Sequence, residues 1–253
     1  MIKFFRNIRQ KLLNEGKTAN YLKYALGEII LVVIGILIAL QINNWNEKRK
    51  EKAFETEMLQ SFKESLSSDL SDIEYNIKQH IKGLAACDSI LIFLKPDIDV
   101  NIDTLSTLFA DAFFVTRFVY STSAFESLKA KGVNIISNKS LQKKIVDVYD
   151  SRYRFFAVSE NDFIENYWLG IQHIFPTRFE EGLNYDLNSK GYPGSLKPRD
   201  VEALKNDKEF IYYLKTNRNW TNLIINFHYE GLKSNIVELL DLIDKELKLN
   251  NNL

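Results

Sequence analysis

The side chains best suited to metal binding or acid–base catalysis are few in this chain and lie far apart. Its three histidines are His80, His173 and His228, and none has a second metal-ligating residue three or four positions away. That spacing matters because it places two ligands on one face of a helix. Spacing therefore predicts no metal site, although the fold could still bring distant residues together into a site that spacing does not reveal.

Two short patterns match one part of a functional motif and lack the rest. Ser140 and Lys143 fit the S-x-x-K pattern of penicillin-interacting enzymes, but the S-D-N and K-T-G companions are absent. PDIDVNIDT, residues 96–104, alternates like the start of an EF-hand loop, but Ile102 and Leu108 occupy the positions that need glycine and glutamate. There is also no glycine-rich phosphate loop and no nucleophile elbow. The sequence therefore predicts a protein that is not an enzyme and has no cofactor.

Composition narrows the fold class and the kinds of partner. The 253 residues carry 33 Lys and Arg against 33 Asp and Glu, so no net charge favours nucleic acid as a partner. Cys87 is the single cysteine, so an intramolecular disulfide is impossible, and we expect a buried thiol. Four prolines and ten glycines are few for a loop-rich β protein. These counts favour an all-α fold with long helices.

One carboxylate, Glu28, lies inside a strongly apolar run. It is the only acidic or basic residue between Tyr24 and Ile42, a segment that spans roughly 28 Å as a helix, close to the thickness of a bilayer core. The run is apolar on every face, a basic segment precedes it, and Trp45 among asparagines follows it, as at a membrane interface. We therefore expect a transmembrane helix over 24–45, with a buried helix of a soluble domain as the alternative.

The flanks of this run predict how the chain sits in the membrane. Residues 1–23 form a basic segment, with apolar residues at helical spacing that suit an interfacial helix on an anionic leaflet. This flank has six Lys and Arg and the following one has four, which favours an internal N-terminus. No small-x-small cleavage site ends the run. We expect an uncleaved signal anchor in the inner (cytoplasmic) membrane, with residues 46–253 as an extracytoplasmic helical bundle.

Helical geometry places Glu28, Val32, Gly35 and Ala39 within about 40° of one line on this helix. Gly35 and Ala39 form a small-x-x-x-small pair, which lets two membrane helices approach closely. An acid on the same stripe favours a face toward protein, because exposure of a carboxylate to lipid is costly. The alternatives are an interfacial carboxylate near Lys23 and an ion-handling acid in a stator-like assembly.

Two segments carry a resemblance to a known family. The run YALGEIILVVIGILIALQINNWNE, behind the start MIKFFRNIRQKLL, and the stretch YSTSAFESLKAKGVNIISNKSLQ are similar to an uncharacterised family of single-pass membrane proteins from Bacteroidota. That family is known only as a domain of unknown function. The resemblance implies an anchored, mostly helical domain in the envelope of these bacteria. It implies no activity, no cofactor and no site residues.

The remaining residues predict a succession of helices. We expect a first long helix that ends near Leu94 before Pro96, a short helix over 124–131, a second long helix that starts at Ser137 or Asn138 and reaches Pro176, and one or two helices from Arg199 to about Leu249. Ser123 and Glu126 fit a capping box for the short helix, and Gly132 fits its stop. The first long helix is expected to bury Phe54, Met58, Phe62, Leu66, Leu70, Ile73, Ile77, Ile81 and Leu84. The second is expected to bury Ile145, Val148, Tyr149, Phe155 or Phe156, Phe163 and Tyr167, and the last Leu214, Ile224, Phe227, Ile236, Leu240, Ile243 and Leu247.

Residues 176–198 are the one long irregular segment. Loops of this length often bind partners, and Arg178, Tyr185 and Tyr192 have the side chains to do so. Packing across the helix ends is the alternative use.

The sequence thus predicts a membrane-anchored, non-catalytic interaction or scaffold protein of the bacterial envelope. It would associate as a homo-oligomer, or with another membrane protein, through its transmembrane helix and its bundle. The alternatives are an extracytoplasmic ligand-binding sensory bundle that acts through a partner, and a stator-like subunit that uses Glu28. A pocket between the long helices, lined by converging polar groups, would favour the sensory bundle.

Overall fold

The computed structural model describes residues 6–7, 18–189 and 191–251 of the chain. It contains two compact units, Met1–Glu55 and Thr56–Leu253, which are described separately below. The apolar positions of the predicted interfacial segment, Ile2, Phe5, Ile8 and Leu12, lie outside the described residues.

Helix α2, Thr18–Phe93, is the longest element and carries the apolar run near its start. Its sequence contains no proline, and Pro96 follows its end, which confirms the predicted stop. The described chain is mostly helical, with one pair of two-residue strands, so the all-α prediction is confirmed.

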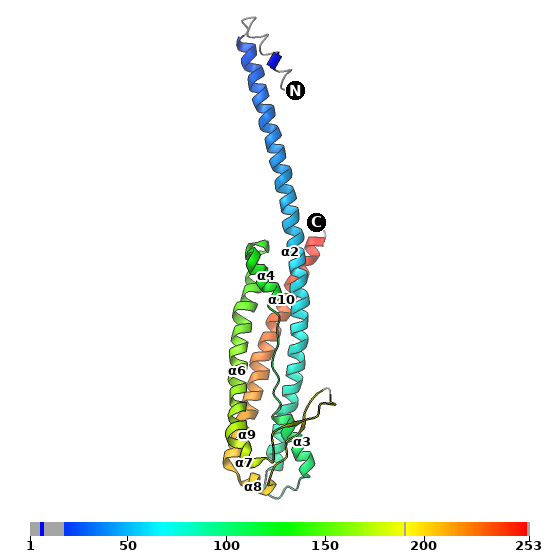
Figure 1. Ribbon diagram of the computed structural model, residues 1–253, viewed down its shortest axis with the longest axis vertical. Coiled ribbons are helices and arrows are strands. Elements are labelled where there is room, and N and C mark those ends of the chain that lie inside the picture. The colour runs from blue at the N-terminus through cyan, green and yellow to red at the C-terminus, as the bar shows by residue number, and fades with distance from the viewer. Residues whose placement is uncertain (1–5, 8–17, 190, 252–253) are drawn as a thin grey trace. The chain divides into compact units, whose positions relative to one another are not determined.

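The helices and strands follow one another along the second unit (Figure 1). The α-helices after α2 are α3 (Ile102–Ala112), α4 (Ser123–Lys131), α5 (Lys139–Val146), α6 (Tyr153–Leu169), α7 (Phe175–Arg178), α8 (Val201–Asn206), α9 (Lys208–Leu223) and α10 (Glu230–Asn251). The short elements are a 3₁₀ turn η1 (Val133–Ile135), three π-helical turns η2 (Asp147–Arg152), η3 (Gly170–Ile174) and η4 (Ile224–Tyr229), and strands β1 (Asn184–Tyr185) and β2 (Gly194–Ser195).

Three helical columns make up most of the second unit: α2 from Thr56 onward, α5 to α7, and α9 to α10. The buried ring of His80 contacts the other two columns, since it lies 5.4 Å from the Phe163 ring and 5.5 Å from the Tyr229 ring. Ion pairs from Lys63 to Asp244, at 2.7 Å, and from Lys233 to Glu74, at 3.0 Å, show that α10 runs antiparallel to α2. The bundle is thus closed by contacts between residues far apart in the sequence.

The buried face of α2 follows a regular alternation of three and four residues, as in a coiled coil. Its members are Leu59, Phe62, Leu66, Asp69, Ile73, Asn76, His80, Gly83, Cys87, Ile90 and Leu94, the last just beyond the helix. We call these residues the seam of α2. The predicted stripe followed the apolar residues instead and departs from the seam toward the end of the helix, so Ile81, predicted to be buried, is 52% exposed. Three polar residues take seam positions that the apolar pattern could not identify.

An extended segment, residues 114–122, connects α3 to α4 along the bundle (Figure 1). Sequence reasoning missed α3 because the alternation in residues 97–103 resembles an extended link. Asn101 caps this helix, since its side chain accepts hydrogen bonds from the backbone N–H groups of Asp103 and Thr104.

Helix α4 confirms the prediction over 124–131 but not its cap. Its first residue is Ser123, and Thr122 stands at the cap position without a side-chain hydrogen bond, so the predicted capping box does not form. Gly132 follows the helix with φ of +100°, a conformation that L side chains rarely adopt, which confirms it as the stop. Asn138 caps α5 as one of the two predicted starts.

The π-helical turns correct the predicted long helices. A π turn inserts one residue into a helix and rotates the residues around it. For this reason Phe227, predicted to be buried, is 61% exposed within η4. Pro176 does not end the second long helix, because it lies in the first turn of α7, where its missing N–H is not needed. Of the two alternatives on α6, Phe156 is buried and Phe155 is exposed.

Candidate functional site

The apolar part of α2 in the first unit is exposed on every side. Of the described helices, α2 alone is long and apolar enough to cross a membrane, and none of the residues in its most apolar window is buried. Ile29, Leu31 and Leu37 each expose more than half of their surface. Within the first unit, no described residue packs against this apolar surface to bury it.

The predicted association face lies on this continuous helix. Glu28 is half-buried, and Val32, Gly35 and Ala39 are exposed. A Cβ atom added at Gly35 would meet no heavy atom within 4 Å. The face is therefore open, and a larger side chain at Gly35 would not disturb the rest of this chain.

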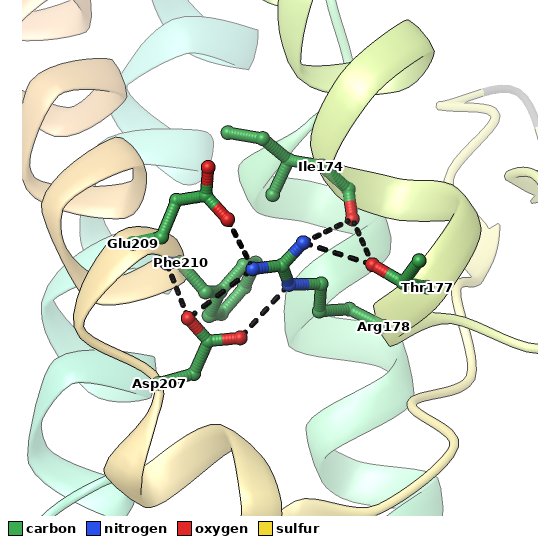
Figure 2. Close-up of polar contacts among 6 residues, drawn as sticks. All are labelled: Ile174, Thr177, Arg178, Asp207, Glu209 and Phe210. Atoms are coloured by element: carbon green, nitrogen blue, oxygen red, sulfur yellow. Dashed lines mark hydrogen bonds and ion pairs between the residues drawn. The ribbon is translucent and has the colours of Figure 1, made fainter.

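Arg178, the first of the predicted partner residues, is held by its own chain (Figure 2). Its guanidinium donates from Nε to Asp207 Oδ2 at 2.8 Å and from Nη2 to Asp207 Oδ1 at 3.3 Å, and it also pairs with Glu209. A further hydrogen bond reaches Thr177 Oγ1 at 2.8 Å, and only 16% of the side chain is exposed. The guanidinium holds the pKa of Asp207 below its usual value. Asp207 also caps α9, since Oδ1 accepts from the Phe210 N–H at 2.9 Å, so Arg178 ties α7 to the start of α9.

Tyr185 and Tyr192, the other two predicted residues, lie together and away from this ion pair. They belong to a hairpin over residues 184–195, here called the arm, in which β1 pairs antiparallel with β2 and Tyr185 lies opposite Gly194. Both rings lie 6.2 Å from the ring of Phe114, and the two tyrosines are 45% and 46% exposed. A Cβ atom at Gly194 would lie 2.0 Å from the backbone oxygen of Asn184, so this close pairing requires glycine. The arm therefore presents a small aromatic surface around Phe114.

Carboxylates at the extended segment 114–122, of which Asp69 and Glu160 are buried, form a site that sequence reasoning did not identify. Asp69 accepts a hydrogen bond from Tyr153 Oη at 2.6 Å and another from the Ser121 N–H at 3.2 Å. Burial raises the pKa of Asp69 above its ordinary value. The neighbouring Asp72 accepts from the Val119 N–H at 3.0 Å. These acids satisfy backbone donors that the extended segment cannot pair with another strand.

Glu160 of α6 holds the same segment from the opposite side. Its Oε1 accepts from the Phe118 N–H at 2.8 Å and from Tyr229 Oη at 3.0 Å, and burial raises its pKa. Because each of these carboxylates is bound by donors of the bundle, their arrangement serves to position the 114–122 segment. The only sequence signal for Asp69 would have been an acid at a seam position of α2.

The three histidines and the single cysteine lie in different elements of the bundle and form no common site. His80 lies in the seam of α2, only 2% exposed, and burial lowers its pKa to about 4. His173 lies in η3 and His228 in η4. Burial raises the pKa of Cys87 to about 12, so its thiol is protonated at neutral pH. Among the described residues, no group of three or more His, Cys, Asp or Glu side chains could hold a metal ion.

Several hollows mark the surface of the second unit. One, of about 480 Å³, lies between α2, α3 and the arm, where Lys82 pairs with Asp111 at 2.7 Å. A second, about 390 Å³, is mainly apolar and lies beside Phe175 and Phe179. A third, about 230 Å³, lies where η4 meets the start of α6. The bundle therefore offers open surface hollows of a size that suits small molecules.

Comparison with known proteins shows one family and no individual relative. No curated protein and no solved structure matches the chain. A family of unknown function (DUF6090) matches residues 28–192, which begins inside the apolar run and ends within the arm. The shared region includes both the exposed apolar helix and the 114–122 segment with its buried carboxylates. By this match, which covers more than half of its length, the chain belongs to the DUF6090 family of unknown function.

Proposed function

We propose that this protein is a non-catalytic interaction or scaffold protein, anchored in a bacterial inner membrane by the apolar segment of α2. The observation that carries the proposal is the exposure of that segment on all faces, which leaves lipid or another membrane helix to cover it. A buried core helix would be covered by its own chain. The family match begins at Glu28, so most of the segment lies in the region that the family shares, which supports an anchor that the mature protein retains.

The flanking charges support an orientation with residues 46–253 outside the cytoplasm. Six Lys and Arg precede the apolar run and four follow it, an excess that favours an internal N-terminus. At the other end, the Arg49 guanidinium lies 5.6 Å from the centre of the Trp45 ring. This pair suits a membrane interface, where an amphipathic ring and a cation both reach the headgroups. The resemblance to Bacteroidota membrane proteins points to the envelope of those bacteria.

Association through the face of Glu28, Val32, Gly35 and Ala39 is the proposed mode of action. A glycine with open space around it lets a second helix approach closely, and Ala39 extends the same stripe by one turn. The partner would be a second copy or another membrane protein. The exposed rings of Tyr185 and Tyr192 offer a further contact surface on the bundle.

A substitution at Gly35 tests this face. Gly35→Leu fills the stripe without meeting any atom of the chain's own fold, so we expect it to abolish association while the helical content stays unchanged. Leu37→Phe, which adds bulk on the opposite side of the helix, is the matched control and should leave association intact. Cross-linking in native membranes measures both variants. Equal association in the Gly35→Leu variant and the unaltered protein would exclude this face.

A ligand-responsive bundle is the second candidate function. The observation in its favour is the 230 Å³ pocket, where polar groups from two helical columns converge. A stator-like use of Glu28 ranks third, and it predicts that Glu28→Gln abolishes function while assembly persists. A fully active Gln variant would exclude that use.

A further inference from the structure

Two π-helical turns from different columns meet at one pocket. η2 ends at Arg152, directly before α6, and η4 supplies Phe227 and His228. The pocket of about 230 Å³ between them is lined by Arg152, Phe155, Phe156, Phe227, His228, Gly231, Leu232 and Asn235. π turns are rare in proteins and occur frequently at functional sites. The convergence of two such turns therefore distinguishes this pocket.

The walls of the pocket are largely aromatic. The His228 ring lies 5.5 Å from the Phe155 ring and 5.0 Å from the Phe227 ring, and the Phe156 ring packs on Tyr229 at 4.6 Å. Phe155 and Phe227 remain more than half exposed, so their faces are free to cover a planar ligand. Rings at these separations favour edge or offset contacts with another aromatic group.

His228 is an incompletely satisfied polar group in this wall. Its Nδ1 atom is buried without a hydrogen-bond partner in the described part of the chain. A buried polar atom without a partner is unfavourable and calls for an explanation. Burial lowers the pKa of His228, so the imidazole is neutral at pH 7 and can donate one hydrogen bond and accept another.

Arg152 supplies the charge of the pocket. Its Nε donates to Asp147 Oδ2 at 3.1 Å, while its two terminal nitrogens find no acceptor among the described residues. Asn235 is already held by Lys144 Nζ at 3.0 Å and by its own hydrogen bond to the Gly231 oxygen at 2.8 Å. None of the lining residues is acidic, so the guanidinium is their single formal charge. The pocket thus combines a cation with uncommitted donors and aromatic walls.

We propose that this pocket binds a small aromatic monocarboxylate. The two terminal nitrogens of Arg152 would bind the carboxylate, because a guanidinium matches its two oxygens. The ring of the ligand would lie against Phe155 and Phe227, and His228 would bond the ligand after rotation of its imidazole. The size fits, since a cavity of about 150 Å³ accommodates benzene and the additional space admits a carboxylate.

Titration with benzoate tests the proposal on the full chain in detergent micelles. Calorimetry, with micelles alone as the blank, should show saturable binding of benzoate at millimolar concentrations or below. Benzamide has nearly the same shape without the charge, and we expect it to bind at least tenfold more weakly. Absence of saturable benzoate binding, or equal binding of benzamide, would overturn the proposal.

Variants locate the site. Arg152 is half-exposed, so Arg152→Gln should fold normally and lower benzoate affinity at least tenfold. Arg154→Gln removes an exposed guanidinium two residues away, outside the pocket, and should leave affinity unchanged. Phe227→Ala should weaken benzoate and benzamide alike, because it removes a shared wall. Benzoate affinity that Arg152→Gln leaves unchanged would overturn the assignment.

This inference rests on the second candidate function and is independent of the membrane anchor. Failure of benzoate binding would leave association through Gly35 untouched, and failure of association would leave the titration untouched. A negative result in either experiment therefore refutes only the proposal that it tests.

Discussion

We expect the free energy of unfolding of the bundle to fall in mild acid because of His80. The size of this loss follows from the lowered pKa of the buried imidazole. The imidazole is 2% exposed, lies between the rings of Phe163 and Tyr229, and its pKa falls from an ordinary 6.5 to about 4. The unfolded chain therefore binds a proton below pH 6.5 that the folded chain does not accept until about pH 4. Because the unfolded state then holds more protons, the free energy of unfolding must fall as the pH is lowered through this interval.

The size of this loss follows from the two pKa values. The interval from 6.5 to about 4, at about 1.4 kcal/mol for each pH unit, amounts to about 3.5 kcal/mol in full, of which about 3 kcal/mol is lost by pH 4, where His80 of the folded chain is half protonated. Asp69 and Glu160 act in the opposite direction, because carboxyl groups whose folded pKa is raised gain stability as they become protonated. The loss is therefore best measured as a difference between two chains that share these acids.

His80→Leu provides that comparison, since leucine has a similar volume and does not titrate. Urea unfolding of both full-length proteins in micelles, followed by helical circular dichroism, should be carried out at pH 7 and at pH 4. We expect the stability of the variant relative to the unaltered protein to rise by about 3 kcal/mol between these pH values. A difference that stays constant with pH would show that His80 is not buried as a neutral ring.

Two further substitutions, with Gly231→Ala as a control, test contacts of the bundle by the same unfolding measurement. A Cβ atom at Gly170 would lie 2.0 Å from Tyr213 Oη, a buried side chain, so Gly170→Ala should cost roughly 1–3 kcal/mol. Gly231→Ala, which meets nothing within 4 Å, should be neutral or stabilising by up to about 1 kcal/mol, and equal effects of the two would refute the contact. Arg178→Gln should cost roughly 1–3 kcal/mol at pH 7, because it leaves Asp207 without its guanidinium. That cost should shrink as the pH falls and Asp207 takes up a proton, and a cost independent of pH would contradict the ion pair.

The sequence predicted those features that depend on neighbouring residues. The apolar run, the end of α2 before Pro96, the stop at Gly132 and the cap at Asn138 all follow from local composition and local hydrogen bonding. The all-α class follows from the same signals, summed along the chain. None of these features requires knowledge of which helices meet.

The misses depend on contacts between distant segments. Asp69 and His80 occupy seam positions because α2 keeps a constant heptad alternation, although apolar residues were available beside them. The exposure of Phe227 depends on a π turn, a one-residue insertion that leaves no mark in hydrophobic periodicity.

The candidate sites also divide into those that follow from local sequence and those that depend on contacts between distant segments. The alignment of Glu28 and Gly35 on one side of the helix could be stated from the sequence because it needs only helical geometry, and its role in association stays a prediction. The separation of Arg178 from Tyr185 could not, since it depends on the pairing of β1 with β2 and on an ion pair to a residue nearly thirty positions away. The pocket beside Arg152 was beyond prediction for the same reason, because its walls come from two columns.

The native mass of the protein, extracted from membranes in a mild detergent, tests the central proposal most directly. An anchored interaction protein should appear as a defined homo-oligomer or with a stoichiometric second protein, and Gly35→Leu should dissociate the oligomer into single chains. A monomer without a bound partner, whose mass Gly35→Leu leaves unchanged, would contradict association as the function of this protein. The ligand-binding bundle would then be the favoured function.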